Sequence, residues 1–241
     1  MQLILHILKW IFTIIILTMM VSFTNQKHAE EVYYLTDIDI LSTGNHYFLN
    51  NNIIIESLKK YIFSRKHQIN DDVSIGMLED RLTTHPAVQN AEVFLIHPGD
   101  VNIKIQAREP VIRIHDINKD YYLDEYTKIM PLSKNYTARV IVATGETIED
   151  NHENLIELSQ SILTDSLLKY QITQIHINEH NDIILIPRIG GHKIIFGDFK
   201  NFNQKLENLS LFYKRKMSIN GWGCYTDINL KFKNQIVCTK K

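Results

Sequence analysis

Cysteine, glycine and proline are all scarce in this chain of 241 residues, which contains 2, 9 and 5 of them. Two cysteines are too few for a disulfide-stapled scaffold or a zinc ribbon, and so few glycines and prolines argue against a collagen-like or linker-rich architecture. The chain also lacks a positive surplus of the kind that neutralises nucleic-acid phosphates, since its formal net charge is −1. We therefore expect no nucleic-acid partner.

Apolar residues make up 44% of the chain and charged residues 22%, a composition that supports a folded core. The longest apolar run covers residues 3–23 and is interrupted by His6 and Lys9. Because about 20 residues span a hydrocarbon core, we predict a tail and transmembrane helix over residues 1–24, with the N-terminus inside. A cleaved signal peptide is the alternative, but no small-x-small cleavage site follows the run.

A compact β-α-α-β-β module is predicted for residues 36–109, after a juxtamembrane linker at residues 25–35. Asn50 precedes apolar residues at helical spacing and can cap a first helix. A second helix begins near Ser74. The clearest strand signal is the alternation of apolar and polar side chains over residues 101–107.

A larger domain is predicted for residues 110–241, built on a mostly antiparallel sheet. Residues 155–170 and 199–213 have apolar side chains at intervals of three and four, which predicts two helices packed on that sheet. The fold class predicted for the whole chain is α+β, with an N-terminal transmembrane helix, the β-α-α-β-β module and the β domain.

No catalytic, cofactor-binding or metal-binding constellation is evident in the sequence. His176 and His180 have the spacing of a zinc pair on a helix, but they fall in a strand and turn without the glutamate of an HExxH motif. Gly190 and Gly191 precede a strand instead of a helix, so they form no phosphate cradle. We therefore predict a non-enzymatic protein that uses no cofactor and no small-molecule substrate.

Cys224 and Cys238 are predicted to remain unpaired. If residues 233–234 form a hairpin turn, Cys238 faces Asn229, and Cys224 then lies roughly 17 Å farther along at ~3.3 Å per residue. A disulfide would require a sharp bend at residues 221–223, and that alternative stays open.

A series of short motifs follows in a fixed order along nearly the whole chain. They are GNHYFL at 44–49, LTTHPAVQNAEV at 82–93, QAREPV at 106–111, YLD at 122–124, MP at 130–131, INLKF at 228–232 and QIV at 235–237. Together they resemble the FtsQ/DivIB family of bacterial cell-division proteins, in which the first module is a POTRA domain. The chain departs from the family in its short N-terminal tail and in Lys231, where arginine is typical.

The resemblance implies a divisome scaffold that binds FtsB-like and FtsL-like bitopic division proteins and helps to recruit or regulate septal peptidoglycan synthesis. It implies a single-pass protein of the inner membrane, with its body in the periplasm, enriched at the division septum. It also implies that a partner adds a strand to the last strand of the β domain, whose exposed edge offers N–H and C=O groups. The residues implied in partner binding are Tyr225, Gln235, Ile236, Val237, Cys238 and Thr239.

Two other functions compete with this interpretation. A POTRA-containing outer-membrane assembly or secretion factor would need a long membrane-embedded C-terminal domain, and the chain after residue 110 leaves no room for one. An anchored extracytoplasmic enzyme would need convergent polar groups in a pocket, and the sequence shows no such set.

Overall fold

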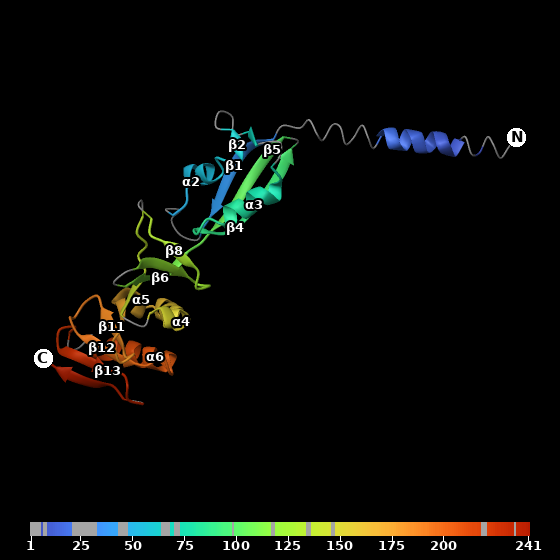
Figure 1. Cartoon of the computed structure of the whole chain (residues 1–241). Coiled ribbons are helices and arrows are strands. Elements are labelled where there is room, and N and C mark those ends of the chain that lie inside the picture. Colours follow the sequence, from blue (N-terminus) through green and yellow to red (C-terminus); the bar gives the residue numbers. More distant parts are fainter. Residues whose placement is uncertain are drawn as a thin grey trace. The chain divides into compact units, whose positions relative to one another are not determined.

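Two compact units make up the computed structural model of this chain (Figure 1). The first comprises Met1–Leu41 and Leu49–Gln106, and the second comprises Ser42–Phe48 and Ala107–Lys241. The residues that the structure describes are 6, 9–20, 33–42, 48–63, 68–69, 73–97, 99–116, 119–133, 136–145, 148–217, 221–233 and 235–241.

An apolar helix covers residues 9–20, inside the predicted membrane segment. In the described part of the chain, no helix combines the length and the apolar character needed to cross a membrane. The prediction of an N-terminal transmembrane helix is therefore wrong. Residues 21–32, which include most of the predicted linker, lie outside the described residues.

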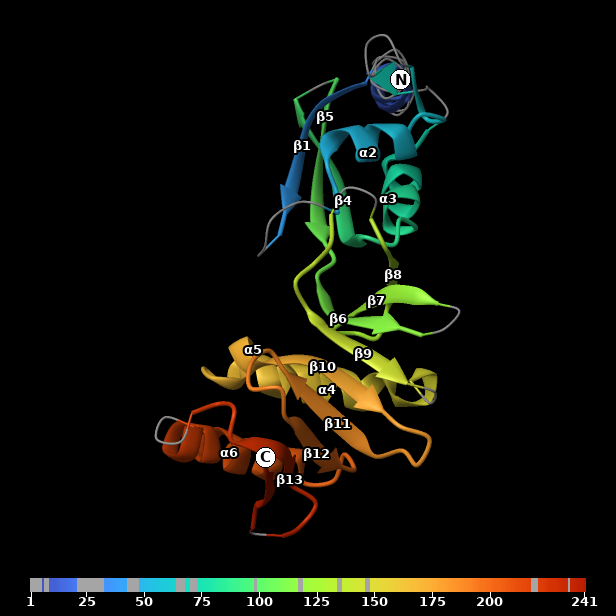
Figure 2. The same cartoon turned by 90° about the vertical axis from the view of Figure 1, so that its left-hand side faces the viewer.

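The first unit is a five-stranded sheet with two helices on one face (Figure 2). Its elements are β1 (Tyr34–Leu41), α2 (Asn51–Ser57), β2 (Ile62–Phe63), β3 (Gln68–Ile69), α3 (Ile75–Thr83), β4 (Val88–His97) and β5 (Asp100–Ala107). The strands lie in the order β2-β3-β1-β5-β4, and β1 runs parallel to β5.

Local sequence chemistry explains how these helices and strands begin. Asn50 Oδ1 accepts the Ile53 amide at 2.9 Å and so caps α2, while Ser74 Oγ accepts the Met77 amide at 3.3 Å and caps α3. The alternation predicted for β5 is confirmed, because its buried side chains are Val101, Ile103, Ile105 and Ala107. The β2–β3 hairpin between the helices was not predicted, since two-residue strands carry no readable periodicity.

The second unit is built on a nine-stranded sheet in the order β14-β13-β12-β11-β10-β9-β6-β7-β8. Its strands are β6 (Pro110–His115), β7 (Asp120–Asp124), β8 (Ile129–Pro131), β9 (Ile141–Gly145), β10 (Ile172–Ile177), β11 (Ile183–Pro187), β12 (Lys193–Gly197), β13 (Tyr225–Asn229) and β14 (Val237–Lys240). Its helical segments are η1 (Glu149–Asn151), α4 (His152–Thr164), α5 (Leu168–Gln171), α6 (Phe202–Phe212) and the π-helical turn η2 (Tyr213–Met217).

This sheet is mixed, with five antiparallel and three parallel strand pairings, which corrects the predicted α+β class to mixed α/β. β6 pairs parallel with β9, β9 with β10, and β12 with β13. Parallel neighbours need crossovers, and here α4 with α5, and α6 with η2, provide two of them. The architecture is therefore mixed α/β with large sheets. It was not predicted because the sequence indicates the turns between strands but not the crossovers.

One hydrophobic core joins the sheet of the second unit to its helices. Alternate strand residues point to that core, and the helices contribute apolar residues at helical spacing. The largest helical contributors are fully or almost fully buried: Leu155, Leu158, Ile162, Leu206 and Leu209. This packing holds α6 beside the end of the sheet where β13 and β14 lie.

Candidate functional site

The strand β14 forms one end of the nine-stranded sheet. It pairs antiparallel with β13, with Val237 opposite Asn229 and Cys238 opposite Ile228. Within the described residues no strand pairs with its other side. Val237 is 46% exposed, so the outer edge of β14 is open to solvent and can accept a further strand.

The six residues implied in partner binding do not all share this surface. Gln235 and Thr239 are exposed beside Val237, while Ile236 and Cys238 are half-buried against the core. These five residues lie together along the edge. Tyr225 differs, because it is 8% exposed and its ring lies 5.8 Å from the Phe212 ring, centroid to centroid. Its ring therefore packs β13 against the end of α6.

The two cysteines are not joined by a disulfide. Cys238 stands opposite Ile228, whereas the Cys224 carbonyl accepts the Lys241 amide at 3.2 Å, so the two thiols lie three strand positions apart. Burial raises the pKa of the Cys238 thiol. The half-buried thiol is therefore a packing group of the edge strand at neutral pH.

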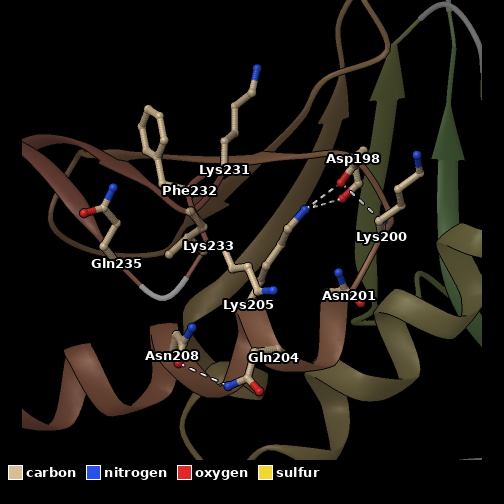
Figure 3. Close-up of a pocket in the computed structure, with 11 residues that line it drawn as sticks. Asp198, Lys200, Asn201, Gln204, Lys205, Asn208, Lys231, Phe232, Lys233 and Gln235 are labelled. Carbon is tan, nitrogen blue, oxygen red and sulfur yellow. Dashed lines mark hydrogen bonds and ion pairs between the residues drawn. The ribbon is translucent and has the colours of Figure 1, made fainter.

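A polar cavity of about 500 Å³ adjoins the start of β14 (Figure 3). It lies between α6 and the connection from β13 to β14. Its lining residues include four lysines and four carboxamides: Lys200, Lys205, Lys231, Lys233, Asn201, Gln204, Asn208 and Gln235. A second cavity, of about 260 Å³, shares Asn208 and Gln235 with the first and is also lined by Leu211, Phe212 and Ile236.

The charge around these cavities is strongly positive. Residues 199–241 contain nine lysines and arginines but only two acidic residues, although the whole chain has a net charge of −1. Lys205 donates to Asp198 Oδ1 at 2.8 Å, and this bond holds the pKa of the Asp198 carboxyl below its ordinary value. A surface with this imbalance attracts carboxylates and repels cationic partners.

A buried aromatic cluster supports β13 and β14 from the core side. His192 Nε2 and the Tyr213 hydroxyl are 2.8 Å apart, and the Tyr213 and Trp222 rings have centroids 5.0 Å apart. Burial lowers the pKa of His192, and the charge of Lys241 lowers it further. Burial raises the pKa of Tyr213. His192 therefore stays neutral inside the folded protein at neutral pH.

This buried histidine should make the second unit sensitive to acid. Because the His192 pKa is lower in the folded chain than its unfolded value near 6.5, the unfolded chain binds the proton first. The free energy of unfolding should keep its full value above about pH 6.5. It should fall as the pH drops from there towards the pKa of His192 in the folded chain. Urea titrations at intervals from pH 8 to pH 5 should show this fall, with a shallower slope in His192→Gln. An unchanged slope in that variant would contradict the assignment.

One family model, described as FtsQ/DivIB, C-terminal related, matches residues 109–239, which is more than half of the chain. The chain belongs to the FtsQ/DivIB family. No curated protein matches the sequence. FtsQ/DivIB membership gives the chain a role in cell division, and the matched region covers β14 as far as Thr239.

Sequence reasoning found the edge strand of this FtsQ/DivIB protein but missed the cavities beside it. They depend on α6 being packed next to the β13–β14 connection, a neighbourhood that no local pattern specifies. One signal was present in the sequence, since the basic residues cluster within residues 199–241.

Proposed function

We propose that this protein is a divisome scaffold that binds FtsB-like and FtsL-like division proteins and helps to recruit or regulate septal peptidoglycan synthesis. The family supplies the role in cell division. The observation that carries the rest is that β14, within the matched region, is an exposed edge strand.

Strand addition is the binding mode that this edge supports. A partner segment in extended conformation would pair with the outward N–H and C=O groups of β14, which supplies affinity, while its alternate side chains supply specificity. Side chains on the helix side would meet Leu211, Phe212 and Ile236 at the cavity of about 260 Å³. That volume suits one large apolar or aromatic side chain.

The basic surroundings add a second requirement for the partner. Carboxylates next to its added strand would lie near Lys200, Lys233 or Arg215, all of which line the two cavities. Such pairs chiefly increase the association rate and the specificity, and salt weakens them. We therefore infer a partner segment that combines apolar strand residues with neighbouring acidic residues.

A scaffold without catalysis fits the chemistry of these cavities. Their side chains are mostly lysines and carboxamides, and Asp198, the carboxylate that lines the larger cavity, is paired with Lys205. In the described part of the chain, no group of three or more metal-ligating side chains comes together. The pairing of Asp198 with Lys205 fits the non-enzymatic role that we propose.

We also propose that the body of the protein works on the extracytoplasmic side of the inner membrane at the division septum. A fluorescent fusion in dividing cells tests the proposed function directly, because a divisome component must concentrate at midcell. We expect the fusion to be enriched at constricting midcell relative to a general membrane marker imaged in the same cells. Equal enrichment of the fusion and the marker in constricting cells would count against the division role.

A further inference from the structure

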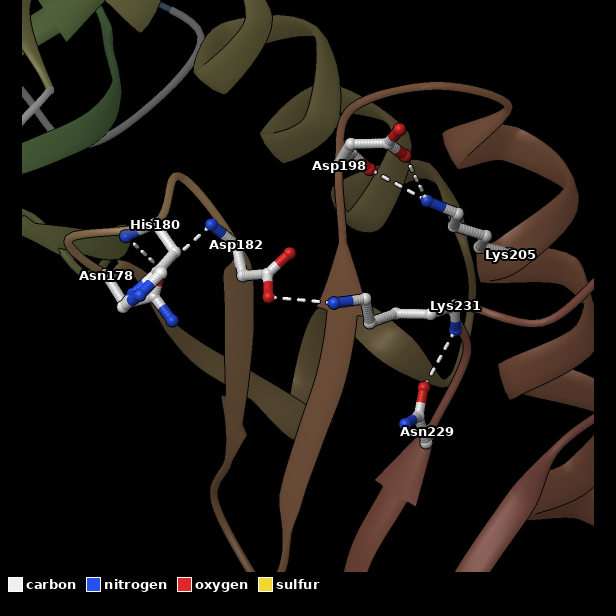
Figure 4. Close-up of polar contacts among 7 residues, drawn as sticks. All are labelled: Asn178, His180, Asp182, Asp198, Lys205, Asn229 and Lys231. Carbon is white, nitrogen blue, oxygen red and sulfur yellow. Dashed lines mark hydrogen bonds and ion pairs between the residues drawn. The ribbon is translucent and has the colours of Figure 1, made fainter.

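The turn between β10 and β11 holds one carboxylate in a defined place (Figure 4). Asn178 Oδ1 accepts the amides of His180 and Asp182 at 3.0 and 2.9 Å, and the Asn178 amide donates to the Asp182 carbonyl at 3.1 Å. Asn181 takes the positive φ of 60° that closes the turn. Asp182 is thereby placed immediately before β11 with a restrained backbone.

A lysine from the far end of the chain reaches this carboxylate. Lys231 Nζ lies 2.8 Å from Asp182 Oδ2 (Figure 4), although 49 residues separate them in sequence. The Lys231 backbone is also held, because its amide donates to Asn229 Oδ1 at 2.9 Å and the preceding Leu230 amide donates to the Ile195 carbonyl at 2.9 Å. Both ends of the ion pair are therefore anchored.

Between them lies Gly197, the last residue of β12. A Cβ at this position would be 2.8 Å from Lys231 Cγ, closer than carbon atoms normally approach. Gly197 also has a φ of 82°, which glycine adopts without strain. The absence of a side chain at Gly197 thus lets the Lys231 stem cross the end of the sheet towards Asp182.

This crossing matters because Lys231 is the second residue of the connection that leads from β13 into β14. In the described residues β14 pairs with β13 alone, so this connection helps to determine where the edge strand lies. We propose that Asp182, Gly197 and Lys231 form a clasp that positions β14 for strand addition. Asp182 and Lys231 are positioning residues: they act through β14 and need not touch a partner.

The clasp rests on the proposed function for its consequence in partner binding, but its effect on β14 can be measured without a partner. Hydrogen exchange of the β14 amides in the full chain reports how often the edge strand opens. The side chains of Lys231 and Asp182 are 43% and 34% exposed, and an ion pair of this exposure shifts an equilibrium by roughly 1.4-fold to 5-fold. Asp182→Asn and Lys231→Met should each accelerate exchange in β14 by an amount in this range.

The choice of variants separates charge from packing. Lys231→Met keeps the stem over Gly197 and removes the charge, and Lys231→Arg keeps the charge and should exchange at the original rate. The double variant should exchange no faster than the faster single variant, because both substitutions remove the same interaction. Glu179→Gln, at an exposed position in the same turn, is the matched control and should leave exchange unchanged. High salt should accelerate exchange in the original chain but not in the double variant.

Unchanged exchange in the single variants, or additive acceleration in the double variant, would overturn the clasp. A second experiment measures binding of the extracytoplasmic segment of an FtsB-like partner. Each single variant should weaken that binding by at most about fivefold. One outcome is that the single variants accelerate exchange, with the double variant no faster than the faster of them, while substitutions within β14 leave partner binding unchanged. That result would support the clasp and contradict the proposed strand addition. The two ideas can therefore fail separately.

Discussion

Replacing Val237 with proline should weaken capture of an FtsB-like partner by about 10-fold to 100-fold. Residues two apart in a strand face the same edge, and the Lys241 amide donates to the Cys224 carbonyl, so the Val237 N–H faces β13. Proline at 237 removes that N–H and displaces the edge strand, and the loss of one or two ladder hydrogen bonds corresponds to roughly this range. Val237 is exposed at the edge of the sheet, so the core should survive the change. Titration of the partner's extracytoplasmic segment against the purified full chain measures the effect.

Two control variants make this result specific to β14. Val237→Thr keeps the N–H and should bind as the original chain does. Ile129→Pro places proline in β8, the strand at the opposite end of the same sheet, where Ile129 is 57% exposed. Binding that resists Val237→Pro, or that is lost equally with Ile129→Pro, would exclude β14 as the docking edge. Thermal unfolding of each variant should confirm that it is folded.

Replacing Arg108 with alanine should destabilise the second unit by about 3–5 kcal/mol. Arg108 pairs with Asp124, whose side chain is 2% exposed, so the substitution leaves a buried carboxylate without its counter-charge. The Asp124 carboxylate also accepts the amides of Tyr126 and Lys128 at 2.9 and 2.7 Å and so organises the turn from β7 to β8. This ion pair therefore joins the start of the second unit to its sheet.

Urea unfolding followed by Trp222 fluorescence, in a Trp10→Phe background, measures this loss for the second unit. Arg113→Ala is the matched control, because Arg113 pairs with Asp120 where both side chains are 26% exposed. A pair with that access to water should contribute about 1 kcal/mol or less. Equal losses in the two variants would show that burial of Asp124 does not determine the effect.

The sequence predicted best the features that depend on neighbours along the chain. The capping of α2 by Asn50 and the alternation of β5 follow from local spacing, and both are confirmed. The family could also be inferred, because its motifs occur in a fixed order, and the family model confirms it. The transmembrane prediction shows the limit of composition, since it rested on the apolar run at residues 3–23, and no helix in the described part of the chain is long and apolar enough to cross a membrane.

Features that depend on distant neighbours could not be predicted from spacing. The parallel pairings of β6 with β9 and β12 with β13 bring together strands that other elements separate in sequence. Tyr225, which was expected to flank the binding edge, lies on β13 opposite Lys240, and the contact of its ring with Phe212 could not be predicted from spacing. The cavities beside β14 likewise arise only once α6 has packed against the last hairpin.

The parallel pairing of β12 with β13 also bears on the order in which the protein folds. The β13–β14 hairpin joins the rest of the sheet through the three residue pairs Lys193↔Asp227, Ile194↔Ile228 and Ile195↔Asn229, after the chain has crossed over through α6. Closing that crossover lowers the entropy of the chain before the pairing of β12 with β13 can offset the loss. We therefore expect the hairpin to dock late in folding. A chain that has collapsed around its central strands would then still lack β14, so the partner binding that we propose for this strand would require complete folding.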